Sequence, residues 1–98
     1  MPRSERFGIG GKIDVLLLDV AELLRFASFS RTDEKVPLLG RAIVKIDSLR
    51  FFVQLAWETK LIPDKQFEEL AILIEEIGRM TGGWHKGLLS KAPLNKER

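Results

Sequence analysis

The sequence has 98 residues, 45% of them hydrophobic and 31% charged, which fits one small globular domain and leaves no room for a second independent core. The absence of cysteine excludes a disulfide framework, a thiol nucleophile and a cysteine-ligated metal, and it agrees with a reducing cytoplasm. The net charge is only +2, and no apolar run approaches the roughly 20 residues that span a bilayer. We therefore expect a soluble, cytoplasmic protein with no membrane partner.

The first apolar repeat along the chain has the period of an α-helix. Its members recur every three or four residues and share one face: Ile13, Leu16, Leu17, Val20, Leu23, Leu24 and Ala27. This helix should end within residues 28–31, and residues 32–35 should form a polar connection. Proline is favoured in the first turn of a helix, so Pro37 predicts the start of the next one.

The second helix is expected to run from about Pro37 to Lys60. Its main apolar stripe consists of Leu39, Ile43, Ile46, Leu49, Val53, Ala56 and Trp57. The third helix should follow Pro63 and Asp64, because both residue types are favoured at a helix start. Its apolar face consists of Phe67, Leu70, Ala71, Ile74 and Ile77. The Thr81-Gly82-Gly83 sequence is expected to stop it.

These segments predict an all-α protein, an antiparallel helical bundle with three long helices. Residues 1–84 would form the bundle domain. Residues 85–98 would form a basic, mobile C-terminal tail.

A second apolar surface lies away from the main stripes. At a rotation of about 100° per residue, Val44, Phe51 and Leu55 point 120–160° away from Leu39 in the stripe of the second helix. On the first helix, four residues also point away from the main stripe: Val15, Leu18, Phe26 and Phe29. Recurrent exposed apolar residues indicate a surface that something covers. We expect a subunit interface at Val44, Phe51, Leu55, Leu18 and Phe26, or a missing helix; simple exposure is the alternative.

Charge is unevenly distributed along the chain. Residues 1–12 sum to +2, residues 13–78 to −4 and residues 79–98 to +4. Basic ends are common where chain termini are solvated, and they are equally consistent with a surface that binds anions.

Arg50 stands on the apolar stripe of the second helix. A buried guanidinium needs a partner, for which Asp14, Glu22 and Glu75 are candidates. We favour a structural ion pair over ligand contact. Gly78 lies near the centre of the third apolar face, where it either permits a close backbone approach or is simply tolerated near a helix end.

The residues of a catalytic site are missing. The sequence has one histidine, no tyrosine and no HExxH or comparable metal-binding spacing. The glycines of residues 8–12 follow no predicted strand and lack the spacing of a phosphate-binding loop. The acidic pairs Glu68-Glu69 and Glu75-Glu76 lie on the outward side of their helix, where they favour solubility. We therefore predict no catalytic residue, no metal site and no cofactor.

Several short motifs resemble one known family. They stand at residues 2–7, 10–13, 49–51, 64–67 and, most specifically, at residues 76–84, where the sequence reads Glu-Ile-Gly-Arg-Met-Thr-Gly-Gly-Trp. In this order and spacing they resemble the four-helix-bundle family of the accessory variability determinant protein of diversity-generating retroelements. The ribosomal intervening-sequence proteins are a more distant resemblance.

The resemblance implies a small basic bundle that assembles as a ring-like homo-pentamer. It also implies that the protein binds the reverse transcriptase of the retroelement and its template RNA, without catalysis of its own. Arg3, Arg6, Arg50 and Arg79 stand at the recurrent basic positions of the family, and Gly78, Gly82, Gly83 and Trp84 match its structural ending. We expect Arg3, Arg6, Arg79 and Lys86 to contact nucleic acid or the reverse transcriptase.

Family members usually carry another helix before the motif at residues 2–7. Either the start site of this chain is internal, or this member has lost that helix. In both cases the second apolar faces would be exposed. The alternative function is an oligomeric helical protein-interaction or scaffold module with no nucleic-acid role, in which Phe51 and Leu55 bind a partner helix.

Overall fold

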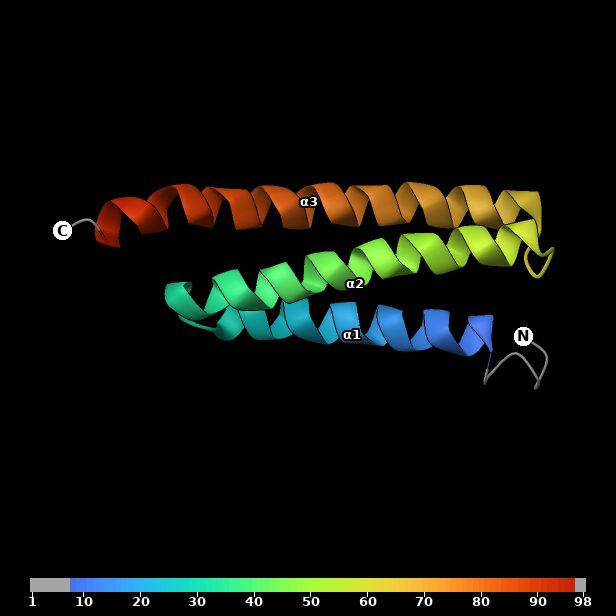
Figure 1. The fold of residues 1–98 in the computed structure, drawn as a ribbon, viewed down its shortest axis with the longest axis horizontal. Coiled ribbons are helices and arrows are strands. Elements are labelled where there is room, and N and C mark those ends of the chain that lie inside the picture. The colour runs from blue at the N-terminus through green and yellow to red at the C-terminus, as the bar shows by residue number, and fades with distance from the viewer. Residues whose placement is uncertain (1–7, 97–98) are drawn as a thin grey trace.

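The computed structural model describes the backbone of residues 8–96 and the side chains of residues 8–90. In that range the chain forms three helices and no strand: α1 (Ile9–Phe29), α2 (Thr32–Glu58) and α3 (Asp64–Lys96). Consecutive helices run in opposite directions, so α1 and α3 point the same way (Figure 1). The predicted all-α antiparallel bundle with three long helices is confirmed.

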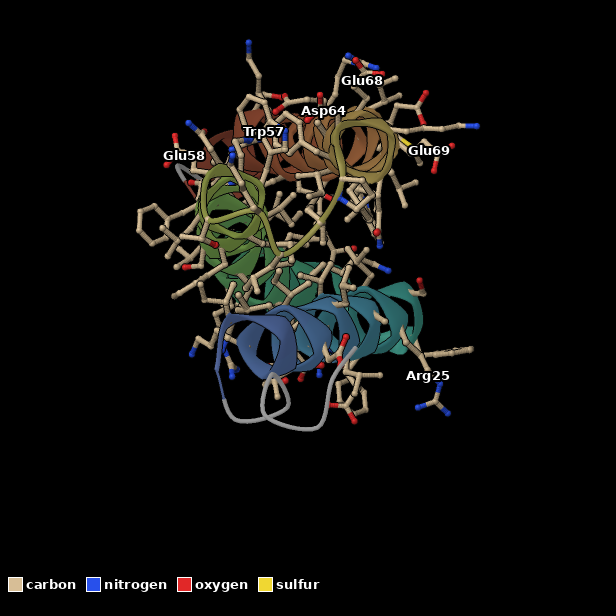
Figure 2. All side chains as sticks on the ribbon, turned by 90° about the vertical axis from the view of Figure 1, so that its right-hand side faces the viewer. Arg25, Trp57, Glu58, Asp64, Glu68 and Glu69 are labelled. Atoms are coloured by element: carbon tan, nitrogen blue, oxygen red, sulfur yellow. The ribbon has the colours of Figure 1, made fainter. Side chains whose placement is uncertain are left out.

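The middle helix, α2, holds the bundle together. Its backbone contacts those of both α1 and α3, whereas the backbones of α1 and α3 make no contact with each other. The end-on view in Figure 2 shows the same arrangement, with α2 to one side of the other two helices. Every contact that fixes α1 relative to α3 therefore passes through α2 or through side chains.

The turn between α1 and α2 is shorter than the sequence predicts. The prediction that residues 32–35 form a connection and that the helix starts at Pro37 is wrong, because α2 begins at Thr32 and contains Pro37. The amide of Lys35 donates to the Arg31 carbonyl at 2.9 Å, so the first turn is closed before the proline. Two acidic residues in that turn suit the positive end of the helix dipole.

The turn between α2 and α3 places a lysine in the left-handed region. Lys60 has φ 66°, a conformation that favours glycine. Its amide donates to the Trp57 carbonyl at 3.0 Å, and the Leu61 amide donates to the Ala56 carbonyl at 2.8 Å, as in a Schellman helix end. The third helix then starts at Asp64, as predicted, and the indole Nε1 of Trp57 donates to the Asp64 carboxylate at 2.8 Å.

The prediction that Thr81-Gly82-Gly83 stops the third helix is wrong, because α3 continues to Lys96. Glycine weakens a helix by about 1 kcal/mol relative to alanine, yet it adopts helical angles readily. Packing supports the continuation: Thr81 is 2% exposed, and Trp84 and His85 are half-buried. The predicted start of the tail at residue 85 thus lies inside a helix, and its mobility stays a prediction.

The core runs along α2. Its buried apolar side chains are Ile13, Leu16, Val20, Leu23 and Ala27 from α1, Leu39, Ala42, Ile46, Leu49, Val53 and Ala56 from α2, Ile62 from the turn, and Ile74 from α3. The other predicted face residues, such as Leu17, Leu24, Phe67 and Ile77, are half-buried. The third helix therefore packs more shallowly than the first.

Candidate nucleic-acid interface

Two of the four predicted anion contacts fall in the described part of the chain. Arg3 and Arg6 lie outside the described residues. Arg79 and Lys86 are both exposed on α3. They are seven residues apart, which is about two helical turns and about 10 Å of rise, so they project from the same face. The unbroken helix is what places both cations on one surface.

The two cations belong to the basic half of a helix whose charge changes sign at its middle. From Asp64 to Gly78, one lysine stands against five carboxylates, for a sum of −4. From Arg79 to Lys96 the sequence has four lysine or arginine residues and no carboxylate, for a sum of +4 with histidine neutral. An anionic partner is therefore attracted to the second half of α3 and repelled by the first.

The helix surface around the two cations carries few side chains. A Cβ atom added at Gly82, Gly83 or Gly87 would meet no atom within 4 Å. These positions thus face open space and leave the helix backbone accessible. A partner can approach closely between Arg79 and Lys86 without meeting a large side chain.

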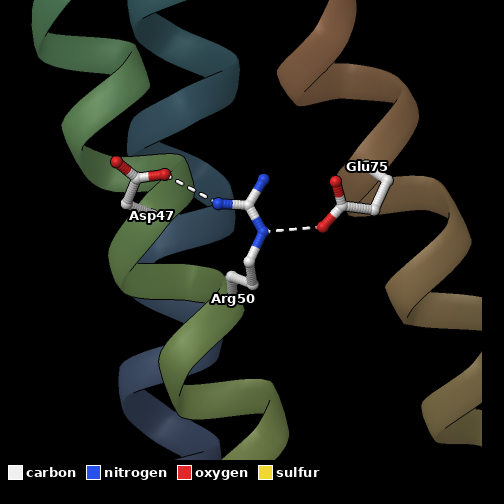
Figure 3. Close-up of polar contacts among 3 residues, drawn as sticks. All are labelled: Asp47, Arg50 and Glu75. Atoms are coloured by element: carbon white, nitrogen blue, oxygen red, sulfur yellow. Dashed lines mark hydrogen bonds and ion pairs between the residues drawn. The ribbon is translucent and has the colours of Figure 1, made fainter.

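Arg50 is held by two carboxylates between α2 and α3 (Figure 3). Its Nε donates to Oε2 of Glu75 at 2.7 Å, and its Nη1 donates to Oδ1 of Asp47 at 2.7 Å. The hydrogen bond to Glu75 raises the pKa of Arg50, supported by Asp47 and opposed by partial burial. The expectation of a buried guanidinium is wrong, because the side chain is 42% exposed. Glu75 was an expected partner, whereas Asp47 was not.

Gly78 provides the space for this ion pair. A Cβ atom at Gly78 would lie 3.2 Å from Nη2 of Arg50 and 3.5 Å from Cγ2 of Ile46. The first distance is tighter than an ordinary contact, and Arg50 is fixed by its two carboxylates. Both atoms belong to side chains, so Gly78 makes room for the Arg50 and Ile46 side chains and not for the close backbone approach that the sequence suggested.

Comparison with known proteins gives a family. The model of the family described as bAvd-like matches residues 1–88. The chain belongs to the bAvd-like family. This agrees with the accessory variability determinant motifs in the sequence, and the match extends past the helix boundary expected at residue 84. No curated protein and no solved structure matches the chain.

In this bAvd-like chain, Trp84 does not end a helix but anchors one. The ammonium of Lys35 lies 5.5 Å from the centroid of the Trp84 ring and donates to the Ala27 carbonyl at 2.7 Å. One residue further on, Nε2 of His85 lies 3.6 Å from where a Cβ atom at Gly40 would stand. The basic half of α3 therefore lies against α2 at Lys35 and Gly40, and Lys35 in turn is hydrogen-bonded to α1.

Sequence reasoning missed exposed cations of the bAvd-like bundle outside α3. Arg25 in α1, Arg31 in the turn and Arg41 in α2 are exposed, and their segments lie at the same end of the bundle as the basic half of α3 (Figure 1). When charge is summed along the sequence, acidic residues nearby in the chain cancel the charge of these arginines. Two cations are already paired: Lys45 donates to Asp19 at 3.1 Å, and Arg31 forms an ion pair with Asp33 at 3.6 Å. Summing the charges of residues that lie side by side in the predicted antiparallel helices could have identified these cations.

The expected subunit interface of the bAvd-like chain is mostly exposed. Val44, Phe51, Leu18 and Phe26 are exposed, whereas Leu55 is half-buried. They occupy the back of α2 and the outer side of α1, away from the core. Whether they contact another subunit stays a prediction.

A separate apolar groove lies between α1 and α3, over α2. It has a volume of about 260 Å³ and is lined by Leu17, Val20, Ala21, Leu24, Ile46, Leu49, Ile74 and Ile77. All of these lining residues are apolar. Among the described residues we find no metal-ligand cluster and no helix with the length and hydropathy of a membrane span.

Proposed function

We propose that this bAvd-like protein is a non-catalytic accessory subunit of a diversity-generating retroelement. It binds the template RNA through the basic half of α3, and it binds the reverse transcriptase of the element in the cytoplasm. Family membership supports the accessory role. The observation that carries the RNA contact is the continuous helix that presents Arg79 and Lys86 on one face beside accessible glycines.

The electrostatics of α3 support an anionic partner on this surface. Within the part of the chain that the structure describes, Arg79 and Lys86 form no ion pair, in contrast with Arg50, whose charge is matched by two carboxylates. Phosphate contacts by such cations release counterions, so binding weakens as the salt concentration rises. Arg3 and Arg6 belong to the same proposal on the basis of the family motif, and Arg25 and Arg41 extend the cationic end.

The test is RNA affinity as a function of salt. We expect replacement of Arg3, Arg6, Arg79 and Lys86 by glutamine to lower the affinity for a short single-stranded RNA. The salt dependence should fall by about 0.7 in the logarithmic slope for each lost phosphate contact. Fluorescence anisotropy at several salt concentrations measures both quantities, and circular dichroism checks that helical content is kept.

The matched control is Lys60→Gln with Lys65→Gln. Both lysines are exposed, and the α2–α3 turn and the start of α3 that carry them lie at the opposite end of the bundle from the basic half of α3 (Figure 1). This control should leave the RNA affinity nearly unchanged. Equal affinity in the four-residue variant and the wild type, or an equal loss in the control, would refute the RNA contact.

A second candidate is a scaffold that uses its exposed aromatic surface. Phe26, Phe29 and Phe51 are exposed, and Phe29 is 83% exposed. Exposed aromatic side chains of this kind mark contacts with other proteins. In this function the chain self-associates, as a pentamer in the family expectation, and has no RNA role.

Phe51→Glu combined with Leu55→Glu tests the scaffold interface. We expect a smaller solution mass by light scattering and an unchanged helical content. Because Leu55 is half-buried, Val44→Glu alone serves as the milder variant. Unchanged mass in both variants would show that this face is not the subunit contact.

A further inference from the structure

The fully buried part of α3 ends at Thr81, well before the helix does. Thr81 is 2% exposed, and the glycine pair Gly82-Gly83 follows it directly. Beyond the pair, the side chains of residues 84–90 are all half-buried or exposed. The last turns of α3 extend past the turn that joins α1 to α2 (Figure 1). Residues 84–96, the outer segment of α3, therefore continue the helix beyond the buried core.

The glycine pair has no steric reason to be glycine. Neither residue has a positive φ, and a Cβ atom at either position would meet nothing within 4 Å. Gly78 differs, because its Cβ atom would lie 3.2 Å from Nη2 of Arg50. Alanine would fit both positions of the pair and favour the helix more, and helices bend sharply at pairs of such small residues. The most easily bent backbone of α3 thus lies just where the buried core ends.

Two side chains hold the outer segment against the rest of the bundle. The ammonium of Lys35 lies 5.5 Å from the centroid of the Trp84 ring and donates to the Ala27 carbonyl at 2.7 Å. Nε2 of His85 lies 3.6 Å from where a Cβ atom at Gly40 would stand. A cation–π contact of a half-buried ring is weaker than the burial of a core side chain. This attachment therefore opens before the core does.

The glycine pair also separates the two cations of the candidate nucleic-acid interface. Arg79 stands before the pair and Lys86 stands after it. In the straight helix both side chains project from one face. A bend at the pair moves Lys86 relative to Arg79, so the spacing of the two cations depends on the angle at the glycines.

We propose that Gly82 and Gly83 form a hinge in α3, and that the contact between Lys35 and Trp84 is the latch that keeps the helix straight. With the latch closed, both cations of the interface face the same partner. With the latch open, the outer segment swings away from α2 as an intact helix. The hinge and the latch are argued from the packing of α3 alone, whereas their effect on RNA rests on the proposed function.

The first test measures the distance between α2 and the outer segment. The chain has no native cysteine, so Glu34→Cys with Ser90→Cys provides two exposed sites for spin labels across the latch. Glu34→Cys with Glu76→Cys is the reference pair, because both positions lie on the core side of the hinge. By double electron–electron resonance we expect a second, longer distance in the first pair and a single distance in the reference pair.

Three changes in the labelled chain distinguish a hinge from local unfolding. Trp84→Leu removes the latch without changing charge, and it should raise the ratio of open to closed chains about fivefold. Gly82→Ala with Gly83→Ala should lower this ratio about fivefold for each glycine. Gly87→Ala, inside the outer segment, should leave the ratio unchanged. Circular dichroism should show the same helical content in Trp84→Leu as in the wild type.

Label distances that Trp84→Leu leaves unchanged would overturn the proposal. So would an open form that Gly87→Ala suppresses as strongly as the change of the glycine pair. Loss of helical content in Trp84→Leu would also contradict it, because the outer segment would then unfold and not swing.

The effect on RNA is tested with unlabelled chains. We expect Trp84→Leu to weaken the binding of a short single-stranded RNA roughly twofold, and Gly82→Ala with Gly83→Ala in the same background to restore it. None of these changes alters charge, so restoration reports the geometry of the helix, whereas a lost direct contact of the Trp84 ring with RNA would not be restored.

The hinge and the proposed function fail in different ways. RNA affinity that stays constant while the label distances change would overturn the effect on RNA and leave the hinge standing. A wild-type chain that binds no RNA would refute the proposed function together with that effect. The label distances decide the hinge in either case.

Discussion

The two outer helices pack against the same central helix in different ways. α1 buries four large or medium apolar side chains and Ala27, whereas α3 buries only Ile74 and Thr81 among its described residues. What α3 lacks in buried area it replaces with specific contacts: the stacked rings of Trp57 and Phe67, the Arg50 ion pairs, and the Lys35–Trp84 contact. α1 therefore contributes more buried apolar surface to the fold, whereas α3 leaves more of its apolar side chains exposed.

The largest expected effect is a difference in the free energy of unfolding lost when a side chain is shortened in the α1–α2 or the α2–α3 interface. Leu16→Ala in α1 removes a side chain that is almost fully buried, and we expect a loss of about 3 kcal/mol in the free energy of unfolding. Ile77→Ala in α3 removes a half-buried side chain and should cost about half as much. Urea denaturation measures both values. Equal losses would show that α3 packs as deeply as α1.

Glycines within α3 provide a finer comparison. Gly83→Ala faces open space and should stabilise the protein by up to about 1 kcal/mol, because alanine favours the helix. Gly78→Ala should gain nothing or destabilise, because its Cβ meets the fixed guanidinium of Arg50. In an Arg50→Ala background the same change should become stabilising. Thermal unfolding of the four variants tests this coupling, and additive effects would contradict it.

A single substitution in the α2–α3 turn should stabilise the protein. Lys60 has a positive φ, so Lys60→Gly relieves a backbone conformation that disfavours side chains. We expect stabilisation by about 1 kcal/mol, read from the urea midpoint at constant slope. Lys65→Gly, in the first turn of α3, is the control and should destabilise. A loss of stability for Lys60→Gly would mean that the lysine side chain makes a contact of greater value.

The last comparison concerns the attachment of the basic half of α3. Lys35→Met removes a cation near the Trp84 ring and a hydrogen bond to Ala27, which should cost about 1 kcal/mol. Hydrogen exchange should show faster opening after Gly83 than before Gly78. Lys12→Met, whose ammonium lies 6.0 Å from the Phe52 ring, is the matched control and should affect only the start of α1.

The sequence predicted most of the fold, because the apolar period of each helix reflects the burial of one face. Ile13 to Ala27 and Leu39 to Ala56 are strongly periodic, and both stripes form the core. The helix ends were harder to predict. Pro37 and the glycines at 82 and 83 usually mark boundaries, yet both lie inside helices here. Each such glycine costs the helix about 1 kcal/mol relative to alanine, and the packing of the residues beyond it outweighs this cost.

Sequence alone also determined the family of this chain, because the motif at residues 76–84 is specific without any coordinates. Tertiary structure decided which residues share a surface. Only the continuous α3 aligns Arg79 with Lys86, and only the packing of α3 on α2 brings Glu75 to Arg50, whereas Asp47 is one turn away on the same helix as Arg50. Helix period is a property of neighbouring residues, whereas partners and exposed faces depend on how distant segments pack.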